Sequence, residues 1–288
     1  MIGIAMISAA VAFNATKDGL VKLMIGDFSP LFLIWAQVSF TALVLVPVIV
    51  FMYGPAVLRP KPLFPQVFRS AVLVSAVFLF YWSLEYIPLA DSTAMIFIAP
   101  ILVTALSPFI LGEKIGPRRW AAVIIGFVGV LIILRPDFSG ERIGYFIALG
   151  CGIFLSFFYM YNRKLSSHTP PLVAAAYTSA IGSLILMPMA PFVWTTPDIA
   201  HASLLGWFFV LSTLGQTLMV ISFRFGPAST LAPFQYIQLL TAVTFGYVVF
   251  GTLPDFWTWT GIALIAGAGL FIVWRERRSL GAEETAAV

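Results

Sequence analysis

The sequence predicts an all-α integral membrane protein with ten transmembrane helices, arranged as two inverted five-helix repeats. Of the 288 residues, 60% are apolar and only 10% are charged, and the mean hydropathy is +1.00. Soluble domains carry about a quarter charged residues, so this composition excludes a soluble enzyme and a disordered chain. Apolar runs of membrane-spanning length recur along the chain, and glycine and proline recur at matching places in its two halves.

Ten apolar runs are the predicted membrane spans, since a spanning helix needs about 20 mostly apolar residues. In order, they cover residues 2–23, 30–53, 64–86, 90–111, 118–134, 143–161, 172–192, 204–223, 228–250 and 256–274. Turn-forming residues separate most of them. These turns contain Asp27-Phe28-Ser29-Pro30, Gly54-Pro55, Pro88, Gly116-Pro117, Arg135-Pro136-Asp137, Thr169-Pro170-Pro171, Gly226-Pro227 and Leu253-Pro254-Asp255.

The distribution of Lys and Arg predicts the orientation, because cytoplasmic loops carry an excess of both. With the N-terminus in the cytoplasm, twelve of the sixteen basic residues lie on the cytoplasmic side, and only Arg135 and Arg142 lie on the other. Lys17 and Lys22 fall within the first span or at its end. We therefore expect a multi-pass protein of the inner membrane with both termini cytoplasmic. The net charge of +4 reflects this topology, and no nucleic-acid partner is expected.

The chain is expected to be duplicated, with repeats at residues 1–135 and 143–274 and a cytoplasmic tail at residues 275–288. At an offset of 139 or 141 the matching pairs are Gly3 with Gly144, Pro30 with Pro171, Pro47 with Pro188, Ser83 with Ser222, Pro88 with Pro227, Gly112 with Gly251, and Trp120 with Trp259. Because five is odd, the second repeat must enter the membrane from the opposite side. Inverted repeats recur in secondary transporters, which hold their substrates between the repeats.

Small residues mark the last span of each half, as the pairs Ala122/Gly126 and Ala263/Gly267. Small residues four apart let helix backbones approach closely. We interpret these pairs as packing within the chain, and a homodimer contact is the alternative interpretation. Membrane lipid is expected around the outer surface of the helices.

Several motifs distributed along the chain carry a family resemblance. They are Asn14-x-x-Lys17-Asp18-x-x-x-Lys22, Ala99-Pro100, Leu111-Gly112-Glu113-Lys114, Trp120 with Gly126-x-x-Gly129, Gln235-Tyr236-x-Gln238, and Gly261 with Gly267. With them the chain resembles the EamA family of the drug/metabolite transporter superfamily over essentially its whole length. The first span and residues 68–136 are most similar to a subgroup that includes S-adenosylmethionine uptake carriers, and aromatic amino-acid exporters belong to the same superfamily. The resemblance implies ten helices in two inverted five-helix repeats.

Two departures distinguish the halves. Thr252 stands where the second half would repeat Glu113, and Pro100 has no partner in the ninth span. The halves are therefore not interchangeable. Glu113 itself, beside Lys114 and Arg118, is interpreted as an electrostatic tie of the loop.

The first span carries the strongest candidate site. An ionisable residue at the bilayer centre costs roughly 2.5–3.5 kcal/mol on insertion scales, so it suggests a function. Asn14, Lys17, Asp18 and Lys22 form one polar stripe on an otherwise apolar helix. They are candidates for the transport path. The structural alternative is that Lys17 pairs with Asp18 or Glu85, or extends toward the membrane surface.

The end of the third span adds three candidates. Glu85 could take up a proton or bind a substrate ammonium, or it could be a solvated charge at the end of a helix. Tyr81 and Trp82 offer aromatic faces to a cationic or aromatic solute, and ordinary core or interface aromatics are the alternative.

The ninth span holds candidates near the bilayer centre. Gln235, Gln238 and Thr241 recur at i, i+3 and i+6, with Tyr236 beside them. Amides in hydrocarbon need partners, so they either bond to neighbouring helices or line a wet cavity, which we favour. In the fourth span, Pro100 frees a backbone carbonyl and permits a bend, which is a hinge, a substrate contact or a static kink.

No catalytic motif accompanies these residues. The sequence has no G-x-x-x-x-G-K-[ST] phosphate loop and no G-x-S-x-G, and both histidines fall between spans. We expect no cofactor, no metal and no enzymatic activity. The predicted function is secondary transport of a small polar solute, which by resemblance is an amino acid or amino-acid derivative. The alternatives are uptake of a larger cationic or heterocyclic metabolite, a membrane enzyme, or a scaffold without transport.

Overall fold

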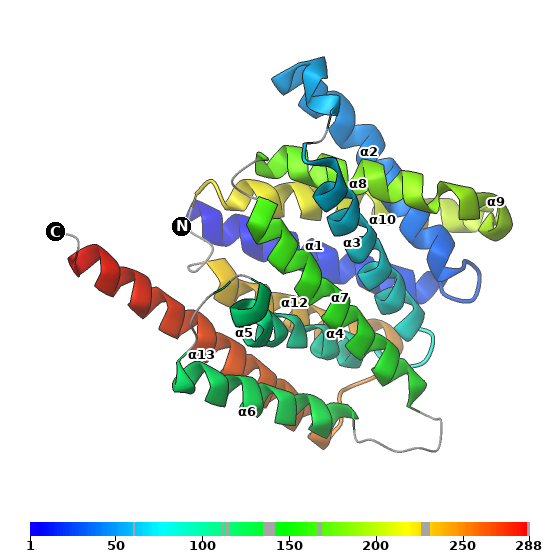
Figure 1. Cartoon of the computed structure of the whole chain (residues 1–288). Coiled ribbons are helices and arrows are strands. Elements are labelled where there is room, and N and C mark those ends of the chain that lie inside the picture. Colours follow the sequence, from blue (N-terminus) through cyan, green and yellow to red (C-terminus); the bar gives the residue numbers. More distant parts are fainter. Residues whose placement is uncertain are drawn as a thin grey trace.

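The computed structural model describes residues 1–59, 61–110, 112, 116–134, 142–165, 169–225 and 231–286, without the side chains of Ala200, Ala232 and residues 275–286. The described part contains no β-strand. Its helices are α1 (Ile2–Met24), α2 (Pro30–Tyr53), η1 (Pro55–Leu58), α3 (Leu63–Ser83), α4 (Leu89–Ile96), α5 (Ile98–Ile110), α6 (Pro117–Leu134), α7 (Ile143–Leu165), α8 (Pro171–Leu186), η2 (Met187–Met189), α9 (Ala190–Val193), α10 (Ile199–Ser222), η3 (Ala232–Tyr236), α12 (Ile237–Phe250) and α13 (Phe256–Ala286) (Figure 1).

The ten predicted spans are confirmed within the described residues, where ten segments are long and apolar enough to cross a membrane. Large apolar side chains cover the outer surface of the bundle. Leu43 and Phe51 on α2 are 72% and 92% exposed, and Ile124 on α6 is 62% exposed. Soluble proteins rarely expose contiguous apolar surface, and hydrocarbon is the environment that suits it. The chain is therefore a multi-pass membrane protein.

Two of the predicted continuous spans are broken near their middle. The fourth consists of α4 and α5, separated at Phe97, whose backbone N–H donates to the carbonyl of Ala94 at 3.2 Å. Pro100 explains the break, because it lacks the N–H that would bond to the carbonyl of Ile96. The ninth span begins as the 3₁₀ segment η3, which contains Pro233, and continues as α12. In both spans a proline near the break removes a helical hydrogen bond.

Other boundaries differ from the sequence prediction. The third span ends at Ser83 rather than 86, which leaves Glu85 in the connection to α4. The seventh span is interrupted after Leu186, where Pro188 follows, and η2 and α9 complete it. The tenth span ends at Trp274 as predicted, and the helix α13 continues beyond it to Ala286. Glu113, Lys114 and the connection at residues 135–141 lie outside the described residues.

The helix pairing has the symmetry that an inverted repeat predicts. The most extensive packing joins α1 with α10, α3 with α7, α6 with α13 and α2 with α8. An exchange of the two halves turns the first–eighth span pair into the sixth–third pair and leaves the fifth–tenth and second–seventh pairs unchanged. The exchange therefore gives back the same four helix pairs that the structure shows. Figure 1 places α6 and α13 side by side along one edge of the bundle.

Matched residues in the two halves also have matched conformations. Gly112 follows the fourth span and Gly251 follows the ninth, which is the fourth span of the second half. Both adopt a left-handed backbone conformation, with φ of 70° and 66°. Glycine is the residue that enters this conformation without steric cost, which explains its recurrence. Ser83 and Ser222 each donate a 2.7 Å hydrogen bond to the carbonyl three residues earlier.

Of the two predicted pairs of small residues, Ala122/Gly126 of α6 is buried within the chain, whereas Ala263/Gly267 of α13 is exposed, which differs from the prediction for that pair. A Cβ atom on Gly129 would lie 2.9 Å from the carbonyl oxygen of Gly261, and one on Gly261 would lie 2.6 Å from that of Gly129. A Cβ atom on Gly126 would lie 2.3 Å from the Cδ1 atom of Ile101 in α5. Beside this contact is an apolar groove of about 350 Å³, lined by Arg118, Ala121, Ala122, Ile125, Ala263, Leu264, Gly267, Ala268 and Phe271.

One end of the bundle is named here the basic end. It is the end where α1 and α3 begin and α7 stops, and it holds Arg59, Lys61, Arg163 and Lys164. One hydrogen bond joins the end of α1 to the residues after α3, and another joins the first half of α3 to the end of α7. These contacts show that α1 and α3 run in the same direction and that α7 runs in the opposite one.

Candidate functional site

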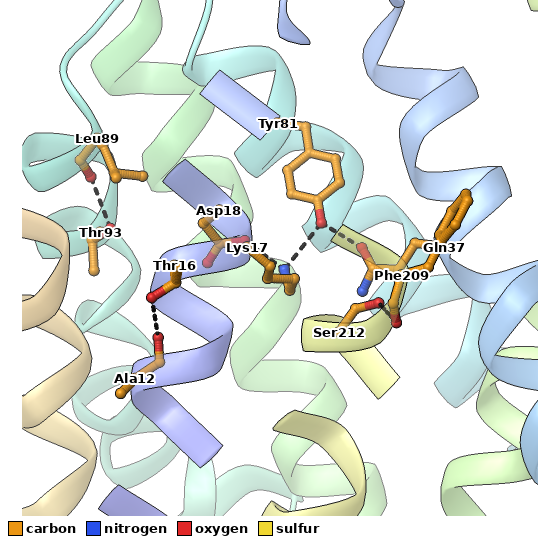
Figure 2. Close-up of polar contacts among 10 residues, drawn as sticks. All are labelled: Ala12, Thr16, Lys17, Asp18, Gln37, Tyr81, Leu89, Thr93, Phe209 and Ser212. Carbon is orange, nitrogen blue, oxygen red and sulfur yellow. Dashed lines mark hydrogen bonds and ion pairs between the residues drawn. The ribbon is translucent and has the colours of Figure 1, made fainter. Parts of the chain in front are cut away.

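A buried polar centre joins α1, α2 and α3. The Lys17 ammonium lies 2.5 Å from Asp18 Oδ1 and donates to the Tyr81 hydroxyl at 3.0 Å. The Tyr81 hydroxyl in turn donates to Gln37 Oε1, as Figure 2 shows. Lys17, Asp18 and Tyr81 are 7%, 4% and 0% exposed. We call these four residues the polar centre. The structure thus brings together three of the predicted site residues and adds Gln37 of α2.

The ion pair at this centre is confined to one helix. Lys17 and Asp18 are consecutive residues, and consecutive side chains on a helix do not face each other. The flexible lysine side chain bends back to reach the carboxylate. Because both charges belong to α1, the pair itself joins no two helices. The Tyr81 hydroxyl makes the link between helices, and the lysine also lies 5.2 Å from the centre of the Tyr81 ring.

The rest of the predicted stripe on α1 is divided. Asn14 packs against α10, where a Cβ on Gly215 would lie 2.9 Å from the Asn14 Oδ1 atom. Lys22 donates to the carbonyls of Leu84 and Ile87 at 2.6 and 2.8 Å. It ties the end of α1 to the connection between α3 and α4. Lys22 therefore has a structural use, and it is not an extension of the polar centre.

Trp82 and Glu85 lie apart from the polar centre. The Trp82 ring stacks on Phe78 of the same helix, with centroids 5.8 Å apart and an interplanar angle of 24°. Glu85 is exposed in the turn after α3, outside the span in which the sequence places it. Partial shielding from solvent raises the pKa of its carboxyl above the ordinary value. Lys17 pairs with Asp18 and not with Glu85.

The two broken spans meet at an aromatic pair. The rings of Phe97, between α4 and α5, and Tyr236, at the end of η3, stack with centroids 4.8 Å apart and planes 16° apart. These residues are 139 apart, the same offset that relates Gly112 to Gly251. The stacked rings therefore belong to residues that the predicted repeat makes equivalent. Close by on the chain, the Pro100 carbonyl accepts a 3.1 Å hydrogen bond from Thr104.

The span-nine amides are half-buried. Within the described part of the chain, neither Gln235 nor Gln238 has a hydrogen-bond partner. Thr241, by contrast, donates to the Ile237 carbonyl of its own helix at 2.9 Å. Gln235 precedes α12 rather than lying within it, so the i, i+3, i+6 pattern starts in a 3₁₀ segment. Both η3 and α12 pack along α1, so the amides and the polar centre lie on neighbouring elements.

Sequence reasoning missed two buried charged residues. Asp91 is 5% exposed in the first turn of α4 and accepts a 2.5 Å hydrogen bond from the Tyr145 hydroxyl of α7. Arg69 is 1% exposed in α3. Neither is among the predicted site residues, and the sequence counts Arg69 only among the basic residues expected on the cytoplasmic side. The polar run Asp91-Ser92-Thr93 inside an apolar segment was the signal that marked the first of them.

Among the described residues, no group of three His, Cys, Asp or Glu side chains could hold a metal ion. The polar centre itself offers one ammonium, one carboxylate, one hydroxyl and one amide. These groups can bind and orient a charged solute.

Comparisons with known proteins agree with this architecture. A relative from Rickettsia prowazekii, an S-adenosylmethionine uptake transporter, is 28% identical over 85% of this chain and 83% of its own. A riboflavin transporter from Vibrio cholerae is 29% identical over 73% of this chain and 72% of its own. An uncharacterized transporter from Helicobacter pylori is 30% identical, with 94% of each chain covered.

A chain of known crystal structure has the same fold. It superposes with a TM-score of 0.67 at 18% sequence identity, and the match covers 96% of this chain and 98% of that one.

The family comparison is the most specific. The model of the EamA-like transporter family matches residues 1–135 and again residues 142–274. Family and relatives are transporters and not enzymes. This multi-pass membrane protein therefore belongs to the EamA-like transporter family.

Proposed function

We propose that this chain is a secondary transporter that moves an amino acid or an amino-acid derivative across the inner membrane by alternating access. The observation that carries the proposal is the Lys17–Asp18 pair, which is buried in a membrane span yet joins no two helices. An ion pair kept for structure is expected to hold neighbouring elements together. A pair confined to one helix is instead available to a ligand.

An α-amino acid presents the same two charges at a similar separation. Its carboxylate would bind Lys17 and its ammonium would bind Asp18, so the solute replaces the protein's internal pair. Charge neutrality holds with and without the solute, which avoids the several kcal/mol that an unpaired buried charge costs. The Tyr81 hydroxyl, held by Gln37, supplies a third polar contact beside Lys17.

Alternating access follows from the proposed repeats at residues 1–135 and 143–274. Two similar halves that enter the membrane from opposite sides can adopt two packings of similar energy, one open to each side. The helix pairing and the matched caps at Gly112 and Gly251 support this division.

The proposed orientation places both termini and the basic end in the cytoplasm, with the residue 275–288 tail. Reporters inserted at Ser166 or fused after Val288 should read cytoplasmic, and one near Asp198 should read external. Reporters at Ser166 and Asp198 that read the same side would overturn this topology.

We propose a monomer as the transporting unit, surrounded by lipid. Gly126, Gly129 and Gly261 already pack inside the chain, which supports this choice. A homodimer through the groove between α6 and α13 is the alternative. Cross-linking of a cysteine placed at exposed Ile124 in native membranes distinguishes the two, because only a dimer through this face gives a covalent pair.

A larger cationic or heterocyclic metabolite is the second candidate solute. Relatives named for S-adenosylmethionine and riboflavin support it. The stacked rings of Phe97 and Tyr236, with Gln235 and Gln238 nearby in sequence, offer flat faces and amides to such a molecule. S-adenosylmethionine combines an amino-acid end with a cationic heterocyclic body, so it fits both candidates.

Uptake by the purified protein in liposomes separates these candidates. Labelled amino acids, S-adenosylmethionine and riboflavin are offered in turn, with protein-free liposomes as the control. We expect saturable uptake of a zwitterionic solute, competed by other α-amino acids and not by methyl esters, which lack the carboxylate. Uptake of riboflavin alone, without competition by any amino acid, would contradict the zwitterion proposal and favour the second candidate.

A further inference from the structure

Arg69 is a buried cation outside the polar centre. Its guanidinium donates to Asn162 Oδ1 of α7 at 3.2 Å. It also donates to the Ala174 carbonyl at 2.8 Å and to Thr178 Oγ1 at 3.0 Å, both on α8. Its Nε atom has no acceptor within the described part of the chain. All three observed acceptors are neutral.

Neutral acceptors compensate a buried guanidinium poorly. A neutral acceptor leaves the positive charge of the guanidinium uncompensated, whereas a carboxylate or phosphate neutralises it and can take two of its N–H groups at once. Buried arginines therefore usually have an acidic partner. Among the described residues, no Asp or Glu side chain lies within 4.0 Å of the Arg69 guanidinium. The site therefore suits a negatively charged group that none of the described residues supplies.

The surroundings of Arg69 contain further polar side chains, one of which is exposed. Gln66, one turn earlier on α3, is fully buried and donates to Thr169 Oγ1 at 3.0 Å. Asn162, by contrast, is exposed, so the cluster reaches the surface at the end of α7. Arg163 and Lys164 follow Asn162 at this basic end. Their positive charge raises the local concentration of anions.

We propose that Arg69, Asn162 and Thr178 form an oxyanion-binding site at the basic end, separate from the polar centre. Arg69 precedes Tyr81 by twelve residues on α3, which is about 18 Å along a helix. A carboxylate or phosphate entering beside Asn162 takes the place of the Ala174 carbonyl and the Thr178 hydroxyl on the guanidinium. The Thr178 hydroxyl, which otherwise donates to the Ala174 carbonyl at 2.8 Å, turns with the Asn162 amide to donate to the same oxyanion.

The oxyanion belongs either to a soluble molecule or to a lipid headgroup, and two arms of one experiment separate these sources. Full-length protein is placed in nanodiscs of phosphatidylcholine, and its unfolding temperature is followed as sodium phosphate is added at constant ionic strength. In the second arm, phosphatidylglycerol replaces part of the phosphatidylcholine and no phosphate is added. A saturable rise in the first arm assigns the site to soluble oxyanions, and a rise in the second arm alone assigns it to lipid.

Arg69→Gln is the decisive variant. It removes the charge and keeps a hydrogen-bonding amide, and we expect it to weaken phosphate or lipid stabilisation by about tenfold or more. Arg59→Gln, at an exposed arginine of the same basic end, is the matched control and should respond as the wild type does. Equal stabilisation of the Arg69→Gln and wild-type proteins, or no rise in either arm, would overturn the proposal.

Thr178→Val keeps the proposal testable if Arg69→Gln fails to fold. This nearly isosteric change removes one neutral group that binds the guanidinium, and also one donor to the oxyanion. Thr178→Val should therefore shift the phosphate concentration at which half of the stabilisation is reached. Thr169→Val, at a neighbouring threonine that accepts a hydrogen bond from Gln66 and makes none to Arg69 within the described residues, should leave that concentration as in the wild type. An unchanged midpoint in Thr178→Val would count against the site.

Discussion

The first helices of the two halves, α1 and α7, differ at the position of the buried ion pair. At the offset of 141, Lys17 and Asp18 of α1 correspond to Phe158 and Tyr159 of α7. The two helices have equivalent positions in the bundle, since α1 packs on α10 as α7 packs on α3. In α7 the ring centroids of Phe158 and Tyr159 lie 5.7 Å apart, and neither side chain is charged.

The fold therefore does not require charged residues at these positions. An apolar or aromatic pair occupies the matching site in α7 and packs against the matching helix. Replacement of buried ion pairs by apolar residues is often neutral for stability in other proteins. The charges of α1 are therefore best explained by what they bind, and substitutions at these matched positions test that explanation.

The largest expected effect comes from removing one charge of the α1 pair. Lys17→Met or Asp18→Asn leaves the other charge buried without its ionic partner, which typically costs 3–5 kcal/mol. Thermal unfolding in detergent and abundance in the membrane both report this loss. Tyr159→Phe at the matched position of α7 is the control and should cost about 1 kcal/mol or less. Single charge variants as stable as Tyr159→Phe would mean that the remaining charge reaches solvent.

An intermediate effect is expected from Tyr81→Phe. The change removes the acceptor of Lys17 and the donor to Gln37 but keeps the ring, so solute affinity should fall about tenfold with normal abundance. Trp82→Phe, at the next position on α3, is the matched control because the Trp82 ring stacks on Phe78 instead. The measurement is the KM for uptake in liposomes. If both variants behave alike, the Tyr81 hydroxyl has no part in solute binding.

A smaller effect is expected from Gln238→Leu in α12. Leucine suits the bilayer, so abundance should stay near normal, while a lost hydrogen bond to the solute should lower uptake about threefold to tenfold. Gln216→Leu, at a lone amide of α10, should leave uptake unchanged. Wild-type uptake per molecule in Gln238→Leu would place this amide among ordinary packing residues and confine the site to the polar centre.

The ten spans were predictable because hydrophobic length decides them, and one residue more or less hardly changes that signal. The breaks in the fourth and ninth spans were less visible. Pro100 indicated a bend, but a proline inside an apolar run does not tell whether the helix kinks or stops. The stacking of Phe97 on Tyr236 depends on how the halves pack, which no local pattern contains.

The polar centre was predictable in part. The sequence alone shows a Lys–Asp pair inside an apolar helix, and it also shows a tyrosine inside another span. That Tyr81 reaches Lys17 while Trp82 faces elsewhere follows from the rotation of α3, which packing decides. Arg69 was assigned to orientation alone, because basic residues near cytoplasmic ends are expected in every membrane protein. Its burial became visible only once α7 and α8 were in place.

The most direct test of the account is transport by the double variant Lys17→Met with Asp18→Asn. Removing both charges leaves no unpaired charge in the membrane, so abundance and thermal stability should stay near those of the wild type. If the pair binds solute, uptake per molecule in liposomes should fall below about a tenth of the wild-type rate, as expected for the loss of charge-assisted hydrogen bonds. A double variant that is abundant and transports at the wild-type rate would contradict the account and return Lys17 and Asp18 to a purely structural role.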